Sequence, residues 1–149
     1  MKLKFRGLTW QKSWVYGLPI RLTEDEEEVD GIQIGLCNVD IDPKTLGMST
    51  NIMCNGKEIY SGDIIGRGGK DGFNDRFVHH DGTNFVFYFY DDPIYPFILY
   101  HQNIDEYDSI IGNIFDNPEL FPQEQLDIIF NRVNIPNKYQ NRFNNENDR

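Results

Sequence analysis

Apolar and polar positions alternate on both sides of an Asn-Gly pair at residues 55–56. Apolar side chains recur within 52–54 before the pair and at Ile59 after it. Asn-Gly supplies the two positive-φ positions of a type I′ turn, so this stretch predicts a tight β-hairpin. Ser61-Gly62-Asp63 should interrupt the second strand, and Ile64-Ile65 should resume it.

The same pattern predicts a series of further strands. A second turn signal, Asp81-Gly82, separates the runs 76–80 and 83–90. It predicts another type I′ hairpin. The run 83–90 is apolar on both faces, which is typical of a central strand. Shorter runs predict strands at 2–6, 14–16, 32–36, 97–100 and 109–115, with a bulge at Gly112 and a turn at 42–47.

One helix is predicted after the strands, over residues 122–133. Pro122 suits the first turn, where its missing N–H costs nothing. Apolar residues recur at i, i+3, i+4 and i+7 and predict one buried face, namely Leu126, Ile129, Phe130 and Val133. The Asn-rich tail, residues 134–149, has few aliphatic side chains and is expected to be disordered.

These elements predict a mainly β fold. The expected architecture is a small, partly open barrel or two packed antiparallel sheets, with one short C-terminal helix. A length of 149 residues suits one domain, which we place at residues 1–133, followed by the tail.

The charge of the chain is strongly negative and uneven. The net charge is −10, although the first 23 residues carry five Lys or Arg and no acid. Residues 91–131 carry nine acids and no Lys or Arg, so a continuous basic groove for a nucleic-acid duplex is not expected there. The acidic run 24–30 lacks the spaced ligands of a calcium loop, and we expect a solvated loop.

Other features point to a soluble protein inside the cell. Cys37 and Cys54 do not form a disulfide framework, and we expect two reduced, partly buried thiols. The N-terminus lacks the apolar core of a signal peptide, and no apolar run is long enough for a membrane helix.

Several segments resemble chemical sites without fitting one. The glycine-rich segment 66–75 matches neither phosphate-binding spacing, so we expect a loop. His79 and His80 are adjacent in a strand and point to opposite faces, which disfavours a shared metal ion. A set of tyrosines can stack on bases, but core packing is the simpler interpretation; the set is Tyr16, Tyr60, Tyr88, Tyr90, Tyr95 and Tyr100. We assign no catalytic, cofactor-binding or metal-binding residue.

Two longer motifs carry a resemblance. The run Asn55-Gly56-Lys57-Glu58-Ile59-Tyr60-x-Gly62-Asp63-Ile64-Ile65 is followed by Ile110-Ile111-Gly112-Asn113-Ile114-Phe115-x-Asn117-Pro118-Glu119-Leu120. Lys4-Phe5-Arg6-Gly7 and the turn at 42–47 stand before them. Over residues 2–121 this arrangement resembles the YopX-like family of phage and prophage proteins. The resemblance implies a mostly β fold, a phage origin and the bacterial cytoplasm, and it brings no catalytic residues.

From these observations we expect a phage accessory protein that works by protein contacts or self-assembly. Exposed strand edges in a β fold offer pairing surfaces for such contacts. One alternative is a nucleic-acid-associated module that uses the basic N-terminal strands. Another is an acidic decoy that occupies the DNA site of a host protein. An enzyme is the least favoured class.

Overall fold

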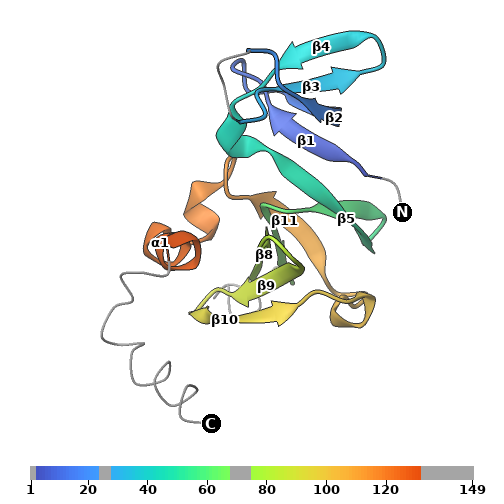
Figure 1. Cartoon of the computed structure of the whole chain (residues 1–149). Coiled ribbons are helices and arrows are strands. Elements are labelled where there is room, and N and C mark those ends of the chain that lie inside the picture. Colours follow the sequence, from blue (N-terminus) through green and yellow to red (C-terminus); the bar gives the residue numbers. More distant parts are fainter. Residues whose placement is uncertain (1–2, 24–27, 68–74, 132–149) are drawn as a thin grey trace.

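The computed structural model describes residues 3–23, 28–67 and 75–131 (Figure 1). Two antiparallel sheets account for nearly half of these residues, and one α-helix follows them. The strands are β1 (Phe5–Leu8), β2 (Trp14–Ile20), β3 (Gly31–Ile34), β4 (Cys37–Asp40), β5 (Gly47–Cys54), β6 (Lys57–Tyr60), β7 (Asp63–Gly66), β8 (Arg76–His80), β9 (Phe85–Phe89), β10 (Asp92–Ile98) and β11 (Ser109–Asn113), and the helix is α1 (Gln123–Asn131). The mainly β prediction is confirmed, in its form with two sheets; neither sheet closes into a barrel.

The six-stranded sheet has the order β4-β3-β2-β1-β5-β6. Its first four strands form successive hairpins, and β5 then returns to pair with the free edge of β1. The predicted pairing of the N-terminal strands is confirmed, with β1 starting at Phe5 and β2 extending to Ile20. The predicted strand 32–36 ends at Ile34, because Gly35 (φ +59) and Leu36 form a two-residue turn into β4, which was not predicted.

The hairpin at residues 55–56 has the predicted geometry. Asn55 and Gly56 both have positive φ, at 49° and 80°, and Cys54 faces Lys57 directly. These are the features of a type I′ turn, which fixes the register between β5 and β6.

The five-stranded sheet has the order β10-β9-β8-β7-β11. Its β8–β9 hairpin is confirmed, but the predicted type I′ turn at 81–82 is wrong, since His80 pairs with Phe85 and leaves a four-residue loop. The Asp81 carboxylate accepts hydrogen bonds from the backbone N–H groups of Thr83 (2.8 Å) and Asn84 (2.7 Å). An Asp side chain that satisfies backbone donors in this way stabilises the longer loop.

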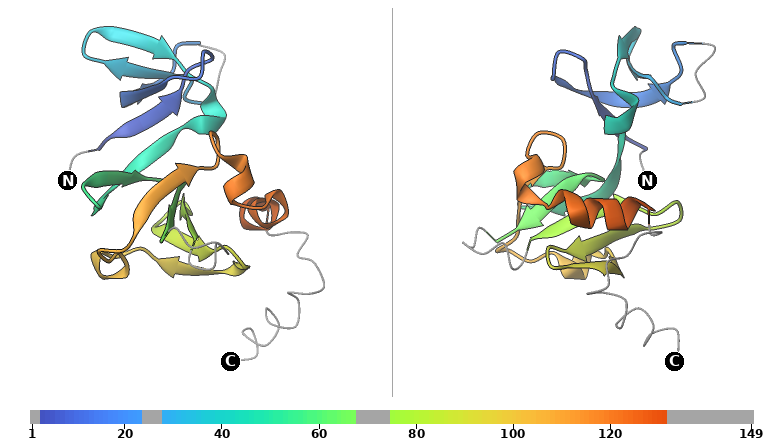
Figure 2. Two further views of the ribbon diagram at one scale, coloured as in Figure 1. Left: turned by 180° about the vertical axis from the view of Figure 1, so that it is seen from behind. Right: turned by 90° about the vertical axis from the view of Figure 1, so that its left-hand side faces the viewer.

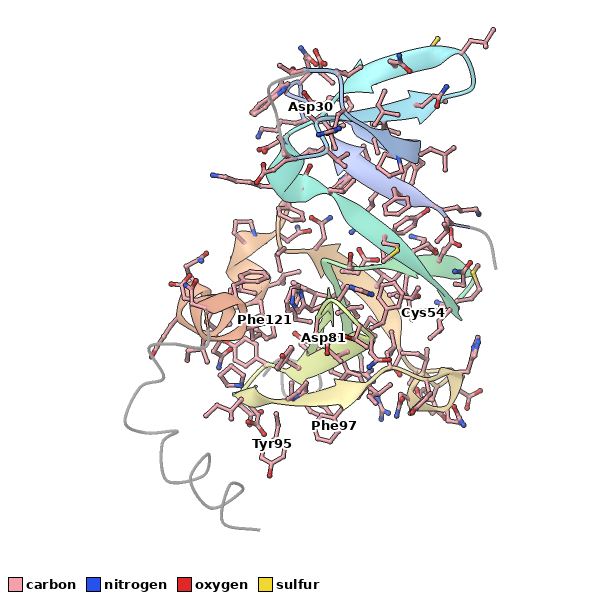
Figure 3. The ribbon with its side chains drawn as sticks, viewed as in Figure 1. Asp30, Cys54, Asp81, Tyr95, Phe97 and Phe121 are labelled. Atoms are coloured by element: carbon pink, nitrogen blue, oxygen red, sulfur yellow. The ribbon has the colours of Figure 1, made fainter. Side chains whose placement is uncertain are left out.

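The five-stranded sheet is covered on both faces. One face packs against the β5–β6 hairpin through Ile52, Cys54 and Ile59. The other face lies under α1 and the turn before it, and Figure 3 shows Phe121 at this junction. Residues along β9 alternate between the two cores, with Phe87 in the first and Val86 and Tyr88 in the second. The aromatic run is therefore a central strand buried on both faces, as predicted.

The helix is shorter in the described residues than the prediction, because positions 132–133 lie outside them. Leu126 and Ile129 are buried as expected, and so is Ile128, which was not assigned to the apolar face. Phe130 is 51% exposed, with its ring edge against Phe77. The tail 134–149 lies outside the described residues, so the division at residue 133 stays a prediction. No helix in the described ranges has the length and apolar character needed to cross a bilayer.

The β3–β4 hairpin lies at the opposite end of the molecule from α1 and β10 (Figures 1 and 2). Leu8, Ile32 and Ile41, in or next to strands β1–β4, are buried, and none of them belongs to the two hydrophobic clusters of the packed sheets. This end therefore projects from the packed pair of sheets.

Candidate functional site

The two long sequence motifs meet in space. Strand β7, which ends the first motif, pairs with β11, which begins the second, and Asp63 faces Asn113. The register shifts between Ile110 and Gly112, so the predicted bulge is confirmed. The motifs, about 45 residues apart in the chain, thus form one structural unit.

The turn after β11 is held by its own asparagines. The Asn113 side-chain oxygen accepts hydrogen bonds from the backbone N–H groups of Phe115 (3.0 Å) and Asp116 (2.9 Å). The Asn117 side-chain oxygen accepts from the Asn113 N–H at 3.2 Å, and a Cβ at Gly112 would lie 2.4 Å from that oxygen. These motif residues therefore fix backbone geometry and do not present reactive groups.

Gly62 is the point where the chain passes from β6 in one sheet to β7 in the other. Its φ is +98°, its N–H donates to Val78 (2.8 Å), and its carbonyl accepts from the Ile114 N–H (3.1 Å). The passage between sheets is thus bonded to both β8 and the β11 turn. A ring contact between Trp14 and Phe115 (6.2 Å) and a bond from Trp14 Nε1 to Asp116 (2.7 Å) attach β2 to the same place.

A buried ion pair lies beside this passage. Arg6 Nη2 is 2.6 Å from Asp63 Oδ1, and their side chains are only 8% and 3% exposed. The guanidinium lies over the rings of Trp14 (4.5 Å) and Tyr60 (5.0 Å). Asp63 also accepts the Tyr60 N–H at 2.8 Å, the kind of side-chain-to-backbone bond that Asp makes in turns. Burial raises the pKa of Asp63, while Arg6 and this N–H oppose the shift.

A pocket opens next to the ion pair, between the six-stranded sheet and strands β7 and β11. Its volume is about 620 Å³, within the range of small-molecule sites. We call it the inter-sheet pocket; its walls are Lys4, Arg6, Tyr16, Gly17, Lys57, Glu58, Tyr60, Asp63 and Ile110. The pocket therefore combines aromatic rings with cationic and anionic side chains.

The polar walls of the pocket are partly bonded to one another. Glu58 accepts from the Tyr60 hydroxyl (3.2 Å) and from Lys4 Nζ (3.4 Å). Burial, reinforced by Glu58, raises the pKa of Tyr60 to about 12, so this phenol stays protonated. Tyr16 stands edge-on to Tyr60, with ring centroids 5.6 Å apart, and is 51% exposed. The Lys57 side chain has no hydrogen bond or ion pair within the described parts of the chain.

A second buried carboxylate serves the scaffold. The side chain of Asp108 is fully buried, pairs with Arg76 and Arg67, and accepts the Asp105 N–H at 3.0 Å. Arg67 also pairs with the Asp105 carboxylate. This network fastens the segment before β11 to β8 and to the end of β7.

The other candidates from the sequence are spread apart. His79 stacks on Phe77, whereas His80 packs on Phe85, and no group of three His, Cys, Asp or Glu among the described residues is arranged to hold a metal ion. Cys54 is buried as expected, and burial raises its pKa; Cys37 is exposed, contrary to the expectation of partial burial.

Two predicted loops lie largely outside the described residues, at 24–27 of the acidic run and 68–74 of the glycine-rich segment. Of the tyrosine set, Tyr16 and Tyr60 are in mutual ring contact.

The Arg6–Asp63 ion pair was not predicted from the sequence, since the partners are 57 positions apart and no local pattern joins them.

The end of the β3–β4 hairpin is a separate candidate, which we call the hairpin tip, residues 33–38. All six residues are exposed and none is charged, in a chain with a net charge of −10. Leu36 is completely exposed and Ile34 is 42% exposed. Strand β4 is also the outer strand of its sheet, so one side of its backbone is unpaired.

Strand β10, an outer strand of the five-stranded sheet, is less open to pairing. Pro93 and Pro96 remove backbone N–H donors from it. Phe97 is already stacked on Phe87 at 5.4 Å, and Figure 3 shows Tyr95 and Phe97 directed outward from this strand. Main-chain pairing with another strand is therefore favoured at β4 over β10.

Comparison with known proteins gives one informative match. No curated protein matches the chain. The family model described as "YopX protein" matches residues 21–122, which include the hairpin tip, both motifs and the passage at Gly62. The chain therefore belongs to the YopX family.

Proposed function

We propose that this protein is a phage or prophage accessory protein that acts by protein contacts in the bacterial cytoplasm, and that the hairpin tip is its contact surface. The observation that carries the proposal is the uncharged, exposed run 33–38, in which Leu36 is completely exposed. Apolar side chains in water are unfavourable, and the cores of protein interfaces are depleted of charge.

The unpaired edge of β4 adds a second means of contact. A partner strand, including β4 of a second copy, can extend the six-stranded sheet through main-chain hydrogen bonds. Between two copies the contact is isologous and closes on a twofold axis. Elsewhere the net charge of −10 disfavours close approach of copies, which makes the uncharged tip the favoured place.

The nucleic-acid and decoy alternatives have weaker support. Of the N-terminal cations, Arg6 is held by Asp63 and Lys4 by Glu58, which reduces the charge available to phosphates. Of the acids in 91–131, Asp105 and Asp108 are paired with arginines. Both alternatives therefore lose part of the charged surface that they need.

The test compares Leu36→Asp with Met53→Asp. Met53 is also exposed (53%) and lies near the end of the other hairpin of the same sheet, so it is a matched control. We expect light scattering, or tagged purification from phage-carrying cells, to show association that Leu36→Asp removes and Met53→Asp retains. A wild-type protein that stays monomeric and retains the same host proteins as Leu36→Asp contradicts the proposal.

A further inference from the structure

The inter-sheet pocket is locally cationic in an acidic protein. Three Lys or Arg side chains line it against two carboxylates, while the whole chain has 14 Lys or Arg and 24 Asp or Glu. Lys57, at its wall, is without a carboxylate partner in the described residues. The pocket therefore favours an anionic group on a ligand.

The aromatic part of the pocket is accessible. Tyr16 is 51% exposed and is supported from the side by the ring of Tyr60. A half-exposed ring held in place by a buried ring is a suitable platform for a second flat ring, since bases stack on such side chains with little dependence on sequence.

The buried floor of the pocket has an unmet hydrogen-bonding group. Arg6 is 7% exposed, and its Nε is buried with no hydrogen-bond partner in the described part of the chain. Buried donors are nearly always paired, so Arg6, which lines the pocket, is not fully satisfied by Asp63. Nε itself has almost no accessible surface, so a ligand oxygen in the pocket interacts with the charge of the guanidinium.

From these three features we propose that the inter-sheet pocket binds a mononucleotide. The base stacks on Tyr16, the phosphate lies at Lys57 and Lys4, and Glu58 offers the type of acceptor that binds a ribose hydroxyl. A single nucleotide is favoured over a nucleic-acid strand for two reasons. Glu58 and Asp63 interrupt the cationic wall of the pocket, and the net charge of −10 repels a chain of phosphates.

The binding experiment uses the full chain with Trp10→Phe, which leaves Trp14 as the fluorescent probe beside Arg6. AMP, GMP, CMP and UMP are titrated, together with adenosine, inorganic phosphate and a twelve-residue oligothymidylate, and calorimetry verifies each fluorescence titration. We expect at least one nucleotide to bind with a Kd below about 1 mM and more tightly than adenosine or phosphate alone.

Variants then locate the site. Tyr16→Ala should weaken nucleotide binding at least about fivefold through lost stacking. Lys57→Gln should weaken it about threefold or more through the lost charged contact. Tyr107→Ala and Lys44→Gln are exposed controls outside the pocket and should bind as the wild type does.

The results also separate this proposal from the proposed function. Leu36→Asp should bind the nucleotide normally, because the hairpin tip is not part of the pocket. Absence of nucleotide binding, equal losses in Tyr16→Ala and Tyr107→Ala, or tighter binding of the oligothymidylate than of any mononucleotide overturns the assignment. The last result identifies a strand-binding surface instead.

Discussion

The Arg6–Asp63 pair offers the most direct test of how the two sheets are held together. Asp63→Asn preserves the shape and the oxygen that accepts the Tyr60 N–H, but it removes the charge opposite Arg6. The guanidinium then stays buried, at 8% side-chain exposure, without a counter-charge. Breaking a buried pair in this way costs about 3–5 kcal/mol, so we expect a loss of that size in the free energy of unfolding.

The reverse change, Arg6→Met, leaves Asp63 as an isolated buried carboxylate. Its pKa is already raised by burial, and loss of Arg6 raises it further. A carboxyl whose folded pKa exceeds its unfolded value favours folding while protonated, and this contribution is lost as pH rises through the folded pKa. Arg6→Met should therefore be closer to the wild type in stability near pH 4 than at pH 7.

The double variant completes the cycle. Arg6→Met with Asp63→Asn has no buried charge, so it should be less destabilised than the sum of the single changes, by about 2–3 kcal/mol. The control is Glu58→Gln, which breaks the neighbouring Lys4–Glu58 pair (3.4 Å, Lys4 48% exposed) and should cost at most about 1 kcal/mol.

Urea unfolding followed by circular dichroism measures each free energy, with the slope m checked for constancy. Asp63→Asn values below about 1 kcal/mol, or single changes that add to the double within about 0.5 kcal/mol, would refute the reasoning. Either result means that water reaches the pair and screens it.

Three further predictions concern the same scaffold. Gly62→Ala should lower the free energy of unfolding in urea by about 1–3 kcal/mol, because an alanine is strained at a φ of +98° and its Cβ would lie 3.3 Å from the Phe115 ring. This loss should be larger than that of Gly56→Ala, where the new Cβ meets open space. In the native protein a thiol reagent should modify Cys37 quickly and Cys54 only after urea is added, since Cys54 is 1% exposed and has a raised pKa; equal rates contradict this burial. The pKa of Tyr60 is raised to about 12, above its unfolded value, so its stabilising contribution should be lost between about pH 10 and 12, and Tyr60→Phe should lack that part of the alkaline decrease.

Local sequence signals predicted those elements whose geometry is decided locally. Asn55-Gly56 has no alternative to its positive-φ pair, and the turn formed as expected. Asp81-Gly82 carries the same signal, but the Asp side chain can also bond the N–H groups of a longer loop, and that competing arrangement prevailed. The Gly112 bulge was predictable because a glycine inside an apolar strand has few other roles.

Other features depend on contacts between distant parts of the chain. Strand β4 alternates over only four residues, from Cys37 to Asp40, which is too short a signal to predict a strand without its pairing with β3. The signal that could have revealed it is Gly35, which allows a two-residue turn between Ile34 and Cys37. The assignment of β6 and β7 to different sheets likewise has no local signature, because a broken strand and a change of sheet look the same in sequence.

The family match covers one part of the inter-sheet pocket and not the other. Residues 21–122 include Lys57, Glu58 and Asp63, and the asparagine-bonded turn that supports β7. Arg6 and Tyr16, which form the facing wall, lie before the match. The motifs hold Asp63 in place through backbone geometry, and β1 supplies the arginine that neutralises it. Loss of nucleotide binding in Tyr16→Ala with unchanged stability would therefore show that Tyr16 contributes to the ligand site and not to the fold.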